Sequence, residues 1–478
     1  MSAPRHIVIL GAGPGGYVAA IRAAQLGARV TLIERQALGG VCLNAGCIPS
    51  KTLLSVVELG EKVTKAMDAG LLVDGPPRFD LVRMVARKNT VVSSLVKGIA
   101  TLLKSWNVTV VQGTGRLVTA TTVAVTAPDG TVQSIQGDAV IVATGSSWPA
   151  LPKFPVDGRQ IITSNHALDR QERPESLVIL GGGVEGCEFA RLYAGLGSQV
   201  TVVELQPRLL PLEDADMSAV VDRELRKRNV TVLTGVSIER VQRDDAGITA
   251  TLTDGTTLTA TCLLVSVGRG FHSRDIGLES LGVAMGRRGE VLVDAQLQTS
   301  VPGLYAIGDV TGVAMLAHVA SEQGKVAVES IFGKPRAIDY NVVPAGIFTV
   351  PEIGRVGLTE QQARERETAA GRDPDRSLAV GRFRFQGLGK AQATGETAGL
   401  CKVIAEADSG RLLGVHIAGA HAADLIHEAA LAMRCGATAE ALATMIHAHP
   451  TYAEGLMEAA EDVHGLAIHS MRKRPGHA

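Results

Sequence analysis

The amino-acid sequence predicts an α/β protein with two nested Rossmann-like dinucleotide-binding domains and a C-terminal α+β domain. Its 478 residues suffice for about three domains of roughly 150 residues each. A strand, a glycine turn, a helix and a second strand follow one another twice along the chain, and the pattern of apolar residues changes from about Tyr340 onward. The 54 glycines and the aromatic content of only 3% favour tight backbone turns over stacking platforms for nucleic acid.

The first of these patterns lies at the N-terminus. His6–Leu10 is apolar, Gly11-Ala-Gly13-Pro-Gly-Gly16 follows, Tyr17–Leu26 has a helical pattern, and Val30–Ile33 is a second strand that ends at Glu34. Glycines at this spacing allow a tight turn and bring the backbone close to a pyrophosphate at a helix N-terminus. An acidic residue after the second strand accepts hydrogen bonds from ribose hydroxyls, so we expect a dinucleotide site here.

The same pattern recurs in the middle of the chain. The apolar strand Leu177–Leu180 precedes Gly181-Gly-Gly183-Val-Glu-Gly186, and a helix over Cys187–Leu196 leads to the strand Val200–Val203 and to Glu204. Two copies of one unit indicate two equivalent dinucleotide-binding domains, which a duplication would explain.

The acidic residues support this equivalence. Glu204 follows Gly181 at the same spacing at which Glu34 follows Gly11. A carboxylate at Glu204 favours the ribose of NAD and would repel the 2′-phosphate of NADP, although Arg208 lies nearby.

Three later apolar strands end in glycine and indicate how the domains are nested. They are Asp138–Gly145, Cys262–Gly268 and Gly303–Gly308. The third has no glycine turn before it, so we expect it to complete the first domain, and the second domain is then an insertion in the first. The predicted boundaries are 1–148 and 276–345 for the first domain, 149–275 for the inserted domain and 346–478 for the C-terminal domain.

The C-terminal part has the pattern of an α+β domain. Alternating apolar stretches are typical of antiparallel strands, and long Ala-rich stretches are typical of helices. The expected strands are 354–358, 378–385, 399–405 and 412–417, and the expected helices are 422–435 and 437–446.

Charge and hydropathy argue against several classes of protein. There are 47 Lys and Arg residues against 48 Asp and Glu residues, so the chain lacks the electrostatic footprint of a protein that binds nucleic acid or an anionic membrane. No stretch of about 18 apolar residues predicts a transmembrane helix. The first strand begins at His6 and leaves no room for a signal peptide, so we expect a cytoplasmic protein.

The segment Gly39-Gly-Val-Cys42-Leu-Asn-Ala-Gly-Cys47-Ile-Pro-Ser-Lys51 carries a second chemical signal. Two cysteines five apart lack the CxxC spacing common in zinc sites. At the start of a helix their Cα atoms would lie about 8 Å apart, whereas a disulfide needs roughly 4.4–6.8 Å. Closing the disulfide then requires local distortion, which makes it easy to reduce, and a helix N-terminus lowers a thiol pKa.

We therefore interpret Cys42 and Cys47 as a redox-active pair. The alternative is that both are buried thiols without redox function and that Lys51 is an ordinary solvated lysine. For the remaining cysteines we expect packing roles; they are Cys187, Cys262, Cys401 and Cys435.

A third signal is His447-Ala-His449-Pro-Thr-Tyr-Ala-Glu454 near the C-terminus. Histidine accepts protons near neutral pH, and a carboxylate behind it fixes its tautomer. These residues alone do not say which histidine acts, and a metal fragment or a surface turn would give the same pattern. His416, His421 and His427 are loosely spaced, and we expect no metal site.

Taken together, the motifs resemble those of the dihydrolipoamide dehydrogenases, which are class I flavoprotein pyridine nucleotide-disulfide oxidoreductases. The resemblance covers nearly the whole chain and implies FAD in the first domain, NAD in the second and a C-terminal dimerisation domain. The motifs are GAGPGGYVAA at 11–20, GGVCLNAGCIPSKTLL at 39–54, ATGS at 143–146, GGGVEGCEFA at 181–190, GLYAIGDV at 303–310 and HAHPTYAEGL at 447–456.

The resemblance also implies roles for single residues. Cys47 would lie next to the flavin and Cys42 would exchange with substrate, while Lys51 and Glu188 would pair near the flavin. His449, and not His447, matches the base of the family, and Glu454 matches its carboxylate partner. The FAD-binding residues would be Gly11, Gly13, Gly16, Glu34, Lys51, Gly115, Thr144, Gly145 and Asp309; those for NAD would be Gly181, Gly183, Gly186, Glu204 and Gly268; and Ala317 would also bind a cofactor.

The function that the resemblance implies is the oxidation of protein-bound dihydrolipoamide by a homodimer, with NAD⁺ as the acceptor. The partner would be a lipoyl-bearing acyltransferase or carrier protein of a 2-oxoacid dehydrogenase or glycine cleavage complex, and free lipoamide would serve as a small substrate. In this family the other subunit contributes the histidine base, so activity would require the dimer.

Some positions depart from the family pattern, and two rival functions stay open. Gly270 and Phe271 replace a basic residue and a proline, the segment Gln386–Lys390 lacks the asparagine and arginine that many members carry, and Val350 stands where histidine is frequent. One rival is another disulfide or metal-ion reductase on the same scaffold, although the C-terminus lacks the vicinal cysteines of mercuric reductases. The other is a flavin-binding component with a docking or regulatory role, since a fold does not fix a function.

Overall fold

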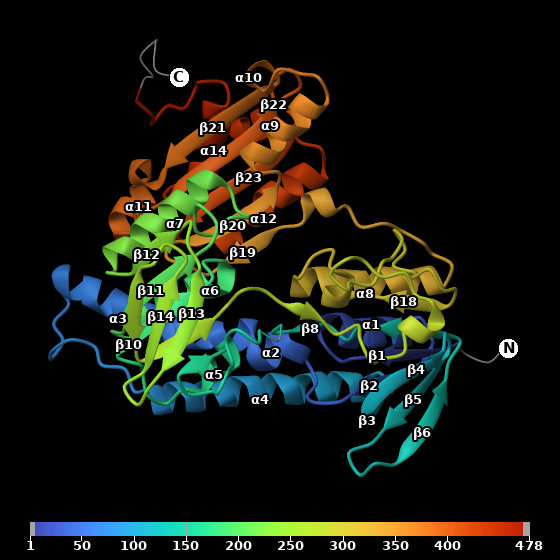
Figure 1. Cartoon of the computed structure of the whole chain (residues 1–478). Coiled ribbons are helices and arrows are strands. Elements are labelled where there is room, and N and C mark those ends of the chain that lie inside the picture. The colour runs from blue at the N-terminus through green and yellow to red at the C-terminus, as the bar shows by residue number, and fades with distance from the viewer. Residues whose placement is uncertain (1–4, 150, 472–478) are drawn as a thin grey trace. The chain divides into compact units, whose positions relative to one another are not determined.

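The structure is a computed structural model that describes residues 5–149 and 151–471. The chain forms two compact units, of which the first comprises residues 1–155, 163–172 and 268–338 and the second comprises 156–162, 173–267 and 339–478. Both contain a parallel sheet with helices, as the predicted α/β class requires (Figure 1). The domain boundaries given above stay a prediction.

The first unit is built on a five-stranded parallel sheet with the order β18-β7-β1-β2-β3. Its central strand, β1, is fully buried. A parallel sheet that is covered on both faces needs apolar side chains on both, and β1 provides them. Leu304 pairs with Val140 across β18 and β7, which confirms that the strand after Gly303 completes the first sheet. The strands are β1 (His6–Leu10), β2 (Arg29–Glu34), β3 (Thr109–Gln112), β7 (Ala139–Val142) and β18 (Leu304–Ala306).

Helices and a small antiparallel sheet complete the first unit. Small residues allow α1 and α8 to pack closely, since a Cβ on Gly324 would lie 2.6 Å from the carbonyl oxygen of Gly15. A three-stranded sheet, β4 (Thr114–Thr119), β5 (Thr122–Thr126) and β6 (Val132–Gln136), was not expected from the sequence. The other elements are α1 (Pro14–Gln25), α2 (Gly40–Ala45), α3 (Cys47–Asp68), α4 (Leu81–Ser105), β8 (Ser146–Ser147), α5 (Ser164–Asp169), β17 (Gly270–Phe271), η1 (Glu279–Leu281), η2 (Gly308–Thr311) and α8 (Ala317–Ile331).

Among the described residues, Gly40–Asp68 is long and apolar enough to cross a membrane by length and composition, since an 18-residue window within it has a mean hydropathy of 1.3. The segment consists of α2 and α3, which meet at Gly46, and α3 packs against α4 in the first unit. A core helix of a globular domain meets the same criterion of length and composition.

The second unit repeats the plan of the first sheet. The order β12-β11-β10-β16-β9 is parallel throughout, and a three-stranded antiparallel sheet again follows the outer strand. The elements are β9 (Ile161–Ile162), β10 (Ser176–Leu180), α6 (Val184–Gly195), β11 (Gln199–Glu204), α7 (Ala215–Lys227), β12 (Thr231–Thr234), β13 (Ile238–Arg243), β14 (Ile248–Leu252), β15 (Thr257–Ala260) and β16 (Cys262–Val265).

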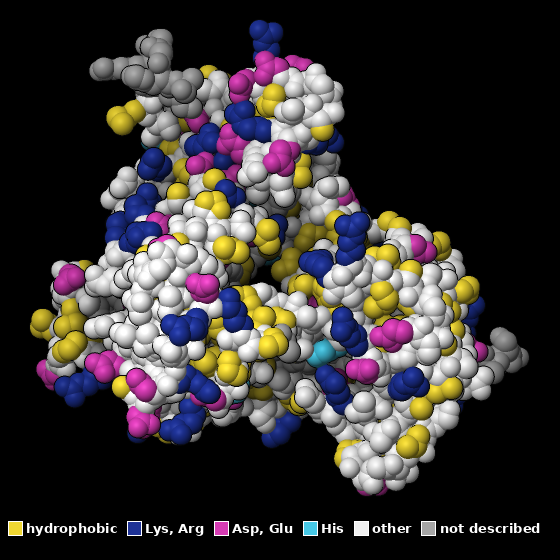
Figure 2. All heavy atoms as spheres, viewed as in Figure 1, with side chains coloured by type: hydrophobic (Ala, Val, Ile, Leu, Met, Phe, Trp, Pro, Cys, Tyr) yellow, Lys and Arg dark blue, Asp and Glu magenta, His cyan; other side chains and the backbone are white. Residues whose placement is uncertain are grey.

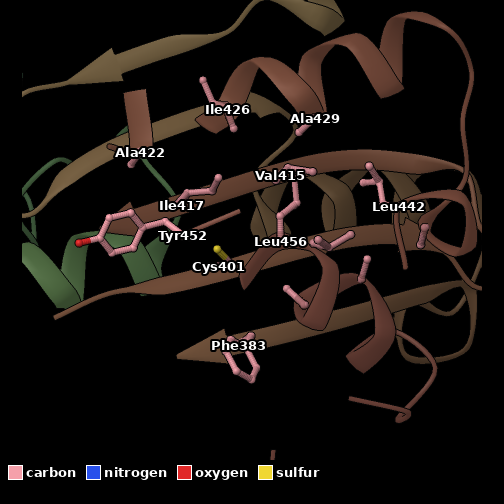
Figure 3. Close-up of a cluster of buried hydrophobic side chains, with 14 of the residues drawn as sticks. Phe383, Cys401, Val415, Ile417, Ala422, Ile426, Ala429, Leu442, Tyr452 and Leu456 are labelled. Carbon is pink, nitrogen blue, oxygen red and sulfur yellow. The ribbon is translucent and has the colours of Figure 1, made fainter. Parts of the chain in front are cut away.

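The second unit also contains the predicted α+β region with its own core. A five-stranded sheet has the order β19-β20-β23-β22-β21 with antiparallel neighbours. Figure 3 shows Ile417, Cys401 and Leu456 facing one another in its buried cluster. The elements are η3 (Tyr340–Val342), β19 (Ala345–Ile347), β20 (Glu352–Gly357), α9 (Glu360–Ala369), α10 (Pro374–Ser377), β21 (Leu378–Arg384), η4 (Phe385–Gly387), α11 (Gly389–Thr394), β22 (Leu400–Glu406), β23 (Leu412–Gly419), α12 (Ala422–Arg434), α13 (Ala439–Thr444) and α14 (Glu454–Asp462).

Charged side chains of both signs alternate on the face shown in Figure 2. In the C-terminal region charged side chains form pairs, such as Arg411 with Glu406 at 2.6 Å and Arg366 with Glu367 at 2.7 Å. Paired charges of this kind produce little net field.

Candidate active site

The two glycine turns have the same backbone geometry. Gly11 and Gly181 have φ angles of 103° and 108°, which favour glycine. A Cβ atom on Gly16 would lie 1.9 Å from the carbonyl oxygen of Gly11, and a Cβ on Gly186 would lie 1.9 Å from that of Gly181. The turns therefore require glycine at both ends.

The predicted ribose-binding acids also have equivalent contacts. Glu34 accepts the N–H of Ala12 at 2.7 Å and the N–H of Gln36 at 2.8 Å. Glu204 accepts the N–H of Gly182 at 2.6 Å and that of Gln206 at 2.7 Å. Each carboxylate oxygen holds one backbone donor and keeps a second lone pair, so the acids shape the turn and can still accept a ribose hydroxyl.

Both helix N-termini at the turns fit a pyrophosphate group. α1 follows Gly13 and α6 follows Gly183, and neither is capped by a side chain. A Cβ on Gly183 would meet no described atom within 4 Å, and one on Gly13 would meet only the Gly40 Cα at 3.9 Å. Uncapped N–H donors with open space in front of them are what a bound phosphate needs.

Asp309 lies in a small polar network that the sequence did not reveal. Its carboxylate accepts the hydroxyl of Ser146, and Arg269 donates to that same hydroxyl and to the Ser146 carbonyl, both at 2.7 Å. The guanidinium of Arg269 also stacks over Trp148 at 4.4 Å. Ser146 and Arg269 stand inside the recognised motifs at 143–146 and after Gly268, but their spacing in the sequence gave no sign that they meet.

The other predicted cofactor residues have different surroundings. The Thr144 hydroxyl donates to the His272 carbonyl at 2.6 Å, while Gly145 and Gly268 have positive φ angles and open space beside them. Gly115 is buried in β4, where a Cβ would lie 2.4 Å from a methyl group of Leu10. Ala317 begins α8, whose N-terminus has no side-chain cap.

Cys42 and Cys47 lie on two helices that meet at Gly46. Cys42 is in α2, Cys47 is the first residue of α3, and their side chains are thiols hydrogen-bonded to each other. A Cβ on Gly46 would lie 3.1 Å from the Val41 carbonyl oxygen. The break at Gly46 supplies the distortion that the spacing of the cysteines requires.

The expected lowering of a thiol pKa is wrong for Cys42. Its hydrogen bond to the Cys47 side chain and its burial raise the pKa of Cys42 well above its usual range. The N–H of Cys47, at the N-terminus of α3, and the charge of Lys51 oppose this rise. The hydrogen bond and the burial both favour the protonated form of Cys42.

Lys51 and Glu188 belong to different units, and their pairing stays a prediction. Lys51 lies one turn after Cys47 in α3. Glu188 is buried in α6 and accepts the N–H of Phe348 at 3.0 Å.

The two histidines of the C-terminal motif differ sharply in environment. His449 has a side chain that is 73% exposed, and its Nδ1 lies 2.8 Å from Glu454 Oε1. The second oxygen of Glu454 accepts the N–H of Thr451 at 2.8 Å. His447 is buried, with 3% exposure, and pairs with Glu428 at 2.9 Å. An exposed imidazole held at one nitrogen presents its Nε2 to a substrate, and of these two histidines it is His449 that does so.

Of the remaining cysteines, Cys187, Cys262 and Cys401 are buried as expected, and burial raises the pKa of Cys187 and Cys401 above the usual range. The packing role predicted for Cys435 is wrong, because Cys435 is exposed at the end of α12. Among the described residues no group of three or more His, Cys, Asp or Glu could hold a metal ion.

Comparison with protein families gives matches over both units. Residues 5–324 match the model of the pyridine nucleotide-disulphide oxidoreductases, and residues 343–460 match the dimerisation domain of the same family. The chain belongs to the pyridine nucleotide-disulphide oxidoreductase family.

Curated relatives and solved structures agree with this family. The chain is 41% identical to the dihydrolipoyl dehydrogenase of Chlorobaculum tepidum, with 97% of each chain covered, and 40% identical to that of Geobacillus stearothermophilus, with 98% and 97% covered. The crystal structure of LpdA from Mycobacterium tuberculosis matches with a TM-score of 0.88 at 31% identity, over 96% of this chain and 99% of LpdA. The HOCl-induced flavoprotein disulfide reductase RclA from Escherichia coli, in a Cu(II) complex, matches with a TM-score of 0.85 at 28% identity over 96% and 99%.

The departures from the family pattern have defined places in this oxidoreductase. Gly270 and Phe271 form β17, which pairs with β8 in the first unit. A Cβ on Gly389, in the segment Gln386–Lys390, would lie 3.7 Å from Cε1 of His449. That segment therefore borders the candidate base, whereas Val350 precedes a cis-proline near Glu188.

Proposed function

We propose that this enzyme oxidises dihydrolipoamide to lipoamide with NAD⁺, using FAD and the Cys42–Cys47 pair. The family uses FAD and a pyridine nucleotide, and relatives at about 40% identity over nearly the full chain are dihydrolipoyl dehydrogenases. The observation that carries the proposal is the contact of the two thiols across the helix break at Gly46. Two buried cysteines without redox function would not need a glycine at the point that brings them together.

The exchange of thiols and disulfides balances without further reactants. With the cysteines oxidised, a substrate thiolate attacks Sγ of Cys42, which breaks the Cys42–Cys47 bond and leaves Cys47 as the thiolate. The second substrate sulfur then attacks the first, forms lipoamide and releases Cys42, which takes up a proton. The raised pKa of Cys42 agrees with this last step, since a released Cys42 readily takes up a proton.

FAD, when bound, supplies the two-electron acceptor that returns the dithiol to the disulfide and delivers hydride to NAD⁺. The residues that would hold it are those around the first glycine turn together with Glu34, Thr144, Gly145 and Asp309. The second glycine turn and Glu204 would hold NAD⁺, because they have the same donors, the same open space and the same acid.

His449 is the proposed proton acceptor. Glu454 holds its Nδ1, so the neutral ring carries a lone pair on Nε2 that removes a proton from a substrate thiol. Burial disfavours ionisation of Glu454, but the Thr451 N–H and the two histidines outweigh it and hold the pKa of Glu454 below its ordinary value of 4.5. The carboxylate is then charged at neutral pH and stabilises the imidazolium.

The dimerisation domain supports a homodimer, in which we propose that His449 acts on the cysteine pair of the other subunit. The proposed substrate is a lipoyl group on an acyltransferase or carrier protein in the cytoplasm, and small dihydrolipoamide serves as its substitute in the assay. Such a partner needs an exposed base, which the 73% exposure of the His449 side chain provides.

The test is the formation of NADH from dihydrolipoamide and NAD⁺ by the FAD-loaded dimer. Wild-type protein and Cys435→Ser, which changes an exposed cysteine outside the pair, should both turn over. Cys42→Ser should lose activity by a factor of about 10³ or more. Equal turnover by Cys42→Ser would refute the proposal. Turnover with another disulfide and NADH, but none with lipoamide, would favour the rival reductase.

A further inference from the structure

The segment between Glu204 and α7 reaches from the proposed NAD site to the C-terminal sheet. At its start, the N–H of Leu210 donates to the carbonyl of Gly182 at 2.8 Å. A Cβ on Gly182 would lie 2.6 Å from a methyl group of Leu209, so the leucine packs directly on the glycine turn. This segment, residues 205–214, therefore supports the second glycine turn, and we call it the support segment.

The support segment is held in a conformation that a leucine rarely adopts. Leu210 has a φ angle of 47°, in the left-handed region, where a Cβ atom crowds the following carbonyl oxygen. The first unit has glycine at the equivalent point, where Gly39, with a φ angle of 91°, donates to the Ala12 carbonyl at 2.8 Å. Such strain persists only where the surrounding structure fixes it.

Two ion pairs fix the far end of the support segment to the C-terminal sheet. Glu213 is buried and pairs with Arg355 of β20 at 2.8 Å. Asp214 is buried and accepts Nζ of Lys402 of β22 at 2.7 Å. Asp214 also caps α7 and accepts the N–H of Glu360 at 3.0 Å.

Lys402 is a buried cation surrounded by three carboxylates. Its Nζ lies 2.8 Å from both Asp216 and Glu360 as well as close to Asp214. Burial disfavours the charge, but the carboxylates outweigh it and raise the pKa of Lys402. A lysine that is 2% exposed and fully paired is a rigid anchor, since removing it would leave buried charges without a counterion.

We infer that Lys402, with Arg355, is a positioning residue for NAD: the C-terminal sheet holds the support segment, and the support segment holds the turn at Gly182 and Glu204. The inference rests on the proposed NAD site in the second unit. It implies that pyridine-nucleotide affinity depends on residues of the C-terminal sheet that touch neither the nucleotide nor the redox pair.

The test measures NADH binding directly, by anaerobic fluorescence titration of FAD-loaded protein whose flavin and disulfide have first been fully reduced, so that NADH binds without reacting. Lys402→Met should raise the Kd for NADH about 3- to 30-fold, the range found for substitutions that act through packed networks. Arg355→Met should raise the Kd for NADH less, because the side chain of this arginine is only partly buried, with 31% exposed. In steady state the KM for NAD⁺ should rise while the KM for dihydrolipoamide stays unchanged.

The matched control is Lys88→Met in the first unit. Lys88 is also buried, and it pairs with Asp169 and the Leu168 carbonyl, so its loss destabilises a unit without touching the support segment. Its NADH affinity should equal that of the wild type.

Wild-type affinity in Lys402→Met or, if that variant does not fold, in Arg355→Met would overturn the inference, and so would equal weakening in Lys88→Met. Failure of the proposed function would look different, because wild-type protein would then bind NADH without oxidising dihydrolipoamide.

Discussion

Single glycines decide where the two sulfurs of the redox pair lie. Gly46 ends α2 and precedes α3, and its missing side chain lets the Val41 carbonyl and the Cys42 backbone approach. The sequence predicted the pair and the need for a distortion, because both follow from the spacing. It could not predict the raised pKa of Cys42, since that depends on the contact between the thiols and on burial.

Gly46→Ala should reduce turnover of dihydrolipoamide about 10- to 100-fold, because a displacement of roughly 1 Å at a reacting atom has an effect of this size. The added Cβ would lie 3.1 Å from the Val41 oxygen and 3.4 Å from the Cys42 Cα. Steady-state kinetics measure the loss. Gly98→Ala in α4, where a Cβ meets no described atom within 4 Å, is the control and should instead stabilise the protein by about 0.5–1 kcal/mol. Full activity in Gly46→Ala would contradict the role of the helix break.

Glu454→Gln should lower kcat about 10²-fold, because the amide no longer stabilises the imidazolium of His449. Glu458→Gln is the matched control, one turn further along α14, and pairs with His469 instead. Its kcat should stay within a factor of about two of the wild type. Rapid kinetics with dihydrolipoamide measure the rates of the two variants. An unchanged kcat in Glu454→Gln would show that this carboxylate has no part in the mechanism.

At the scale of elements, the sequence predicted those helices and strands whose apolar residues recur at a regular spacing. The strands and helices of both glycine motifs and the four long strands of the C-terminal sheet are confirmed within a few residues. The antiparallel sheets β4-β5-β6 and β13-β14-β15 were missed, since β6 and β13 are short, exposed and lack an alternating apolar pattern. Contacts between distant elements, such as Ser146 with Arg269, leave no periodic trace in a single sequence.

The segment after α14 is tied to that helix by a contact that depends on pH. Nδ1 of His469 bonds to Glu458 at 2.5 Å and its N–H to the same carboxylate at 3.2 Å. The hydrogen bond and the charge of Glu458 raise the pKa of His469 above 6.5. A raised histidine pKa gives stabilisation that is complete below pH 6.5 and is lost as the pH rises through the raised value.

Amide hydrogen exchange in residues 465–471, corrected for its intrinsic pH dependence, should therefore be faster at about pH 9 than at about pH 6. The exposed position of His469, whose side chain is 68% exposed, keeps the effect small and local. His469→Gln should exchange equally fast at both pH values. Protection that does not change with pH in the wild type would contradict the assignment.

At the scale of the whole molecule, one plan is used twice. Each parallel sheet carries a glycine turn, an uncapped helix N-terminus and an acid that holds two backbone N–H groups. After the acid the copies diverge: the first leads into the redox helices and the second into the support segment and α7. The low aromatic content has no explanation in these contacts.

NADP⁺ in place of NAD⁺ should lower kcat/KM about 10²-fold, because Glu204, the buried acid of the proposed NAD site, would repel the 2′-phosphate. Parallel assays with the two nucleotides measure the ratio. Similar values for both would mean that Glu204 does not exclude the 2′-phosphate of NADP⁺.

The most direct test of the redox pair counts thiols. Oxidised, FAD-loaded protein is reduced anaerobically with about one equivalent of dihydrolipoamide per subunit, incubated with or without NAD⁺, and only then labelled with iodoacetamide and mapped by mass spectrometry. Without NAD⁺, new labels should appear at Cys42 and Cys47 alone; with NAD⁺, neither of these labels should appear, because the disulfide re-forms while one NADH forms per subunit. Labels that do not change, or that appear at Cys187, Cys262, Cys401 or Cys435, would contradict the account.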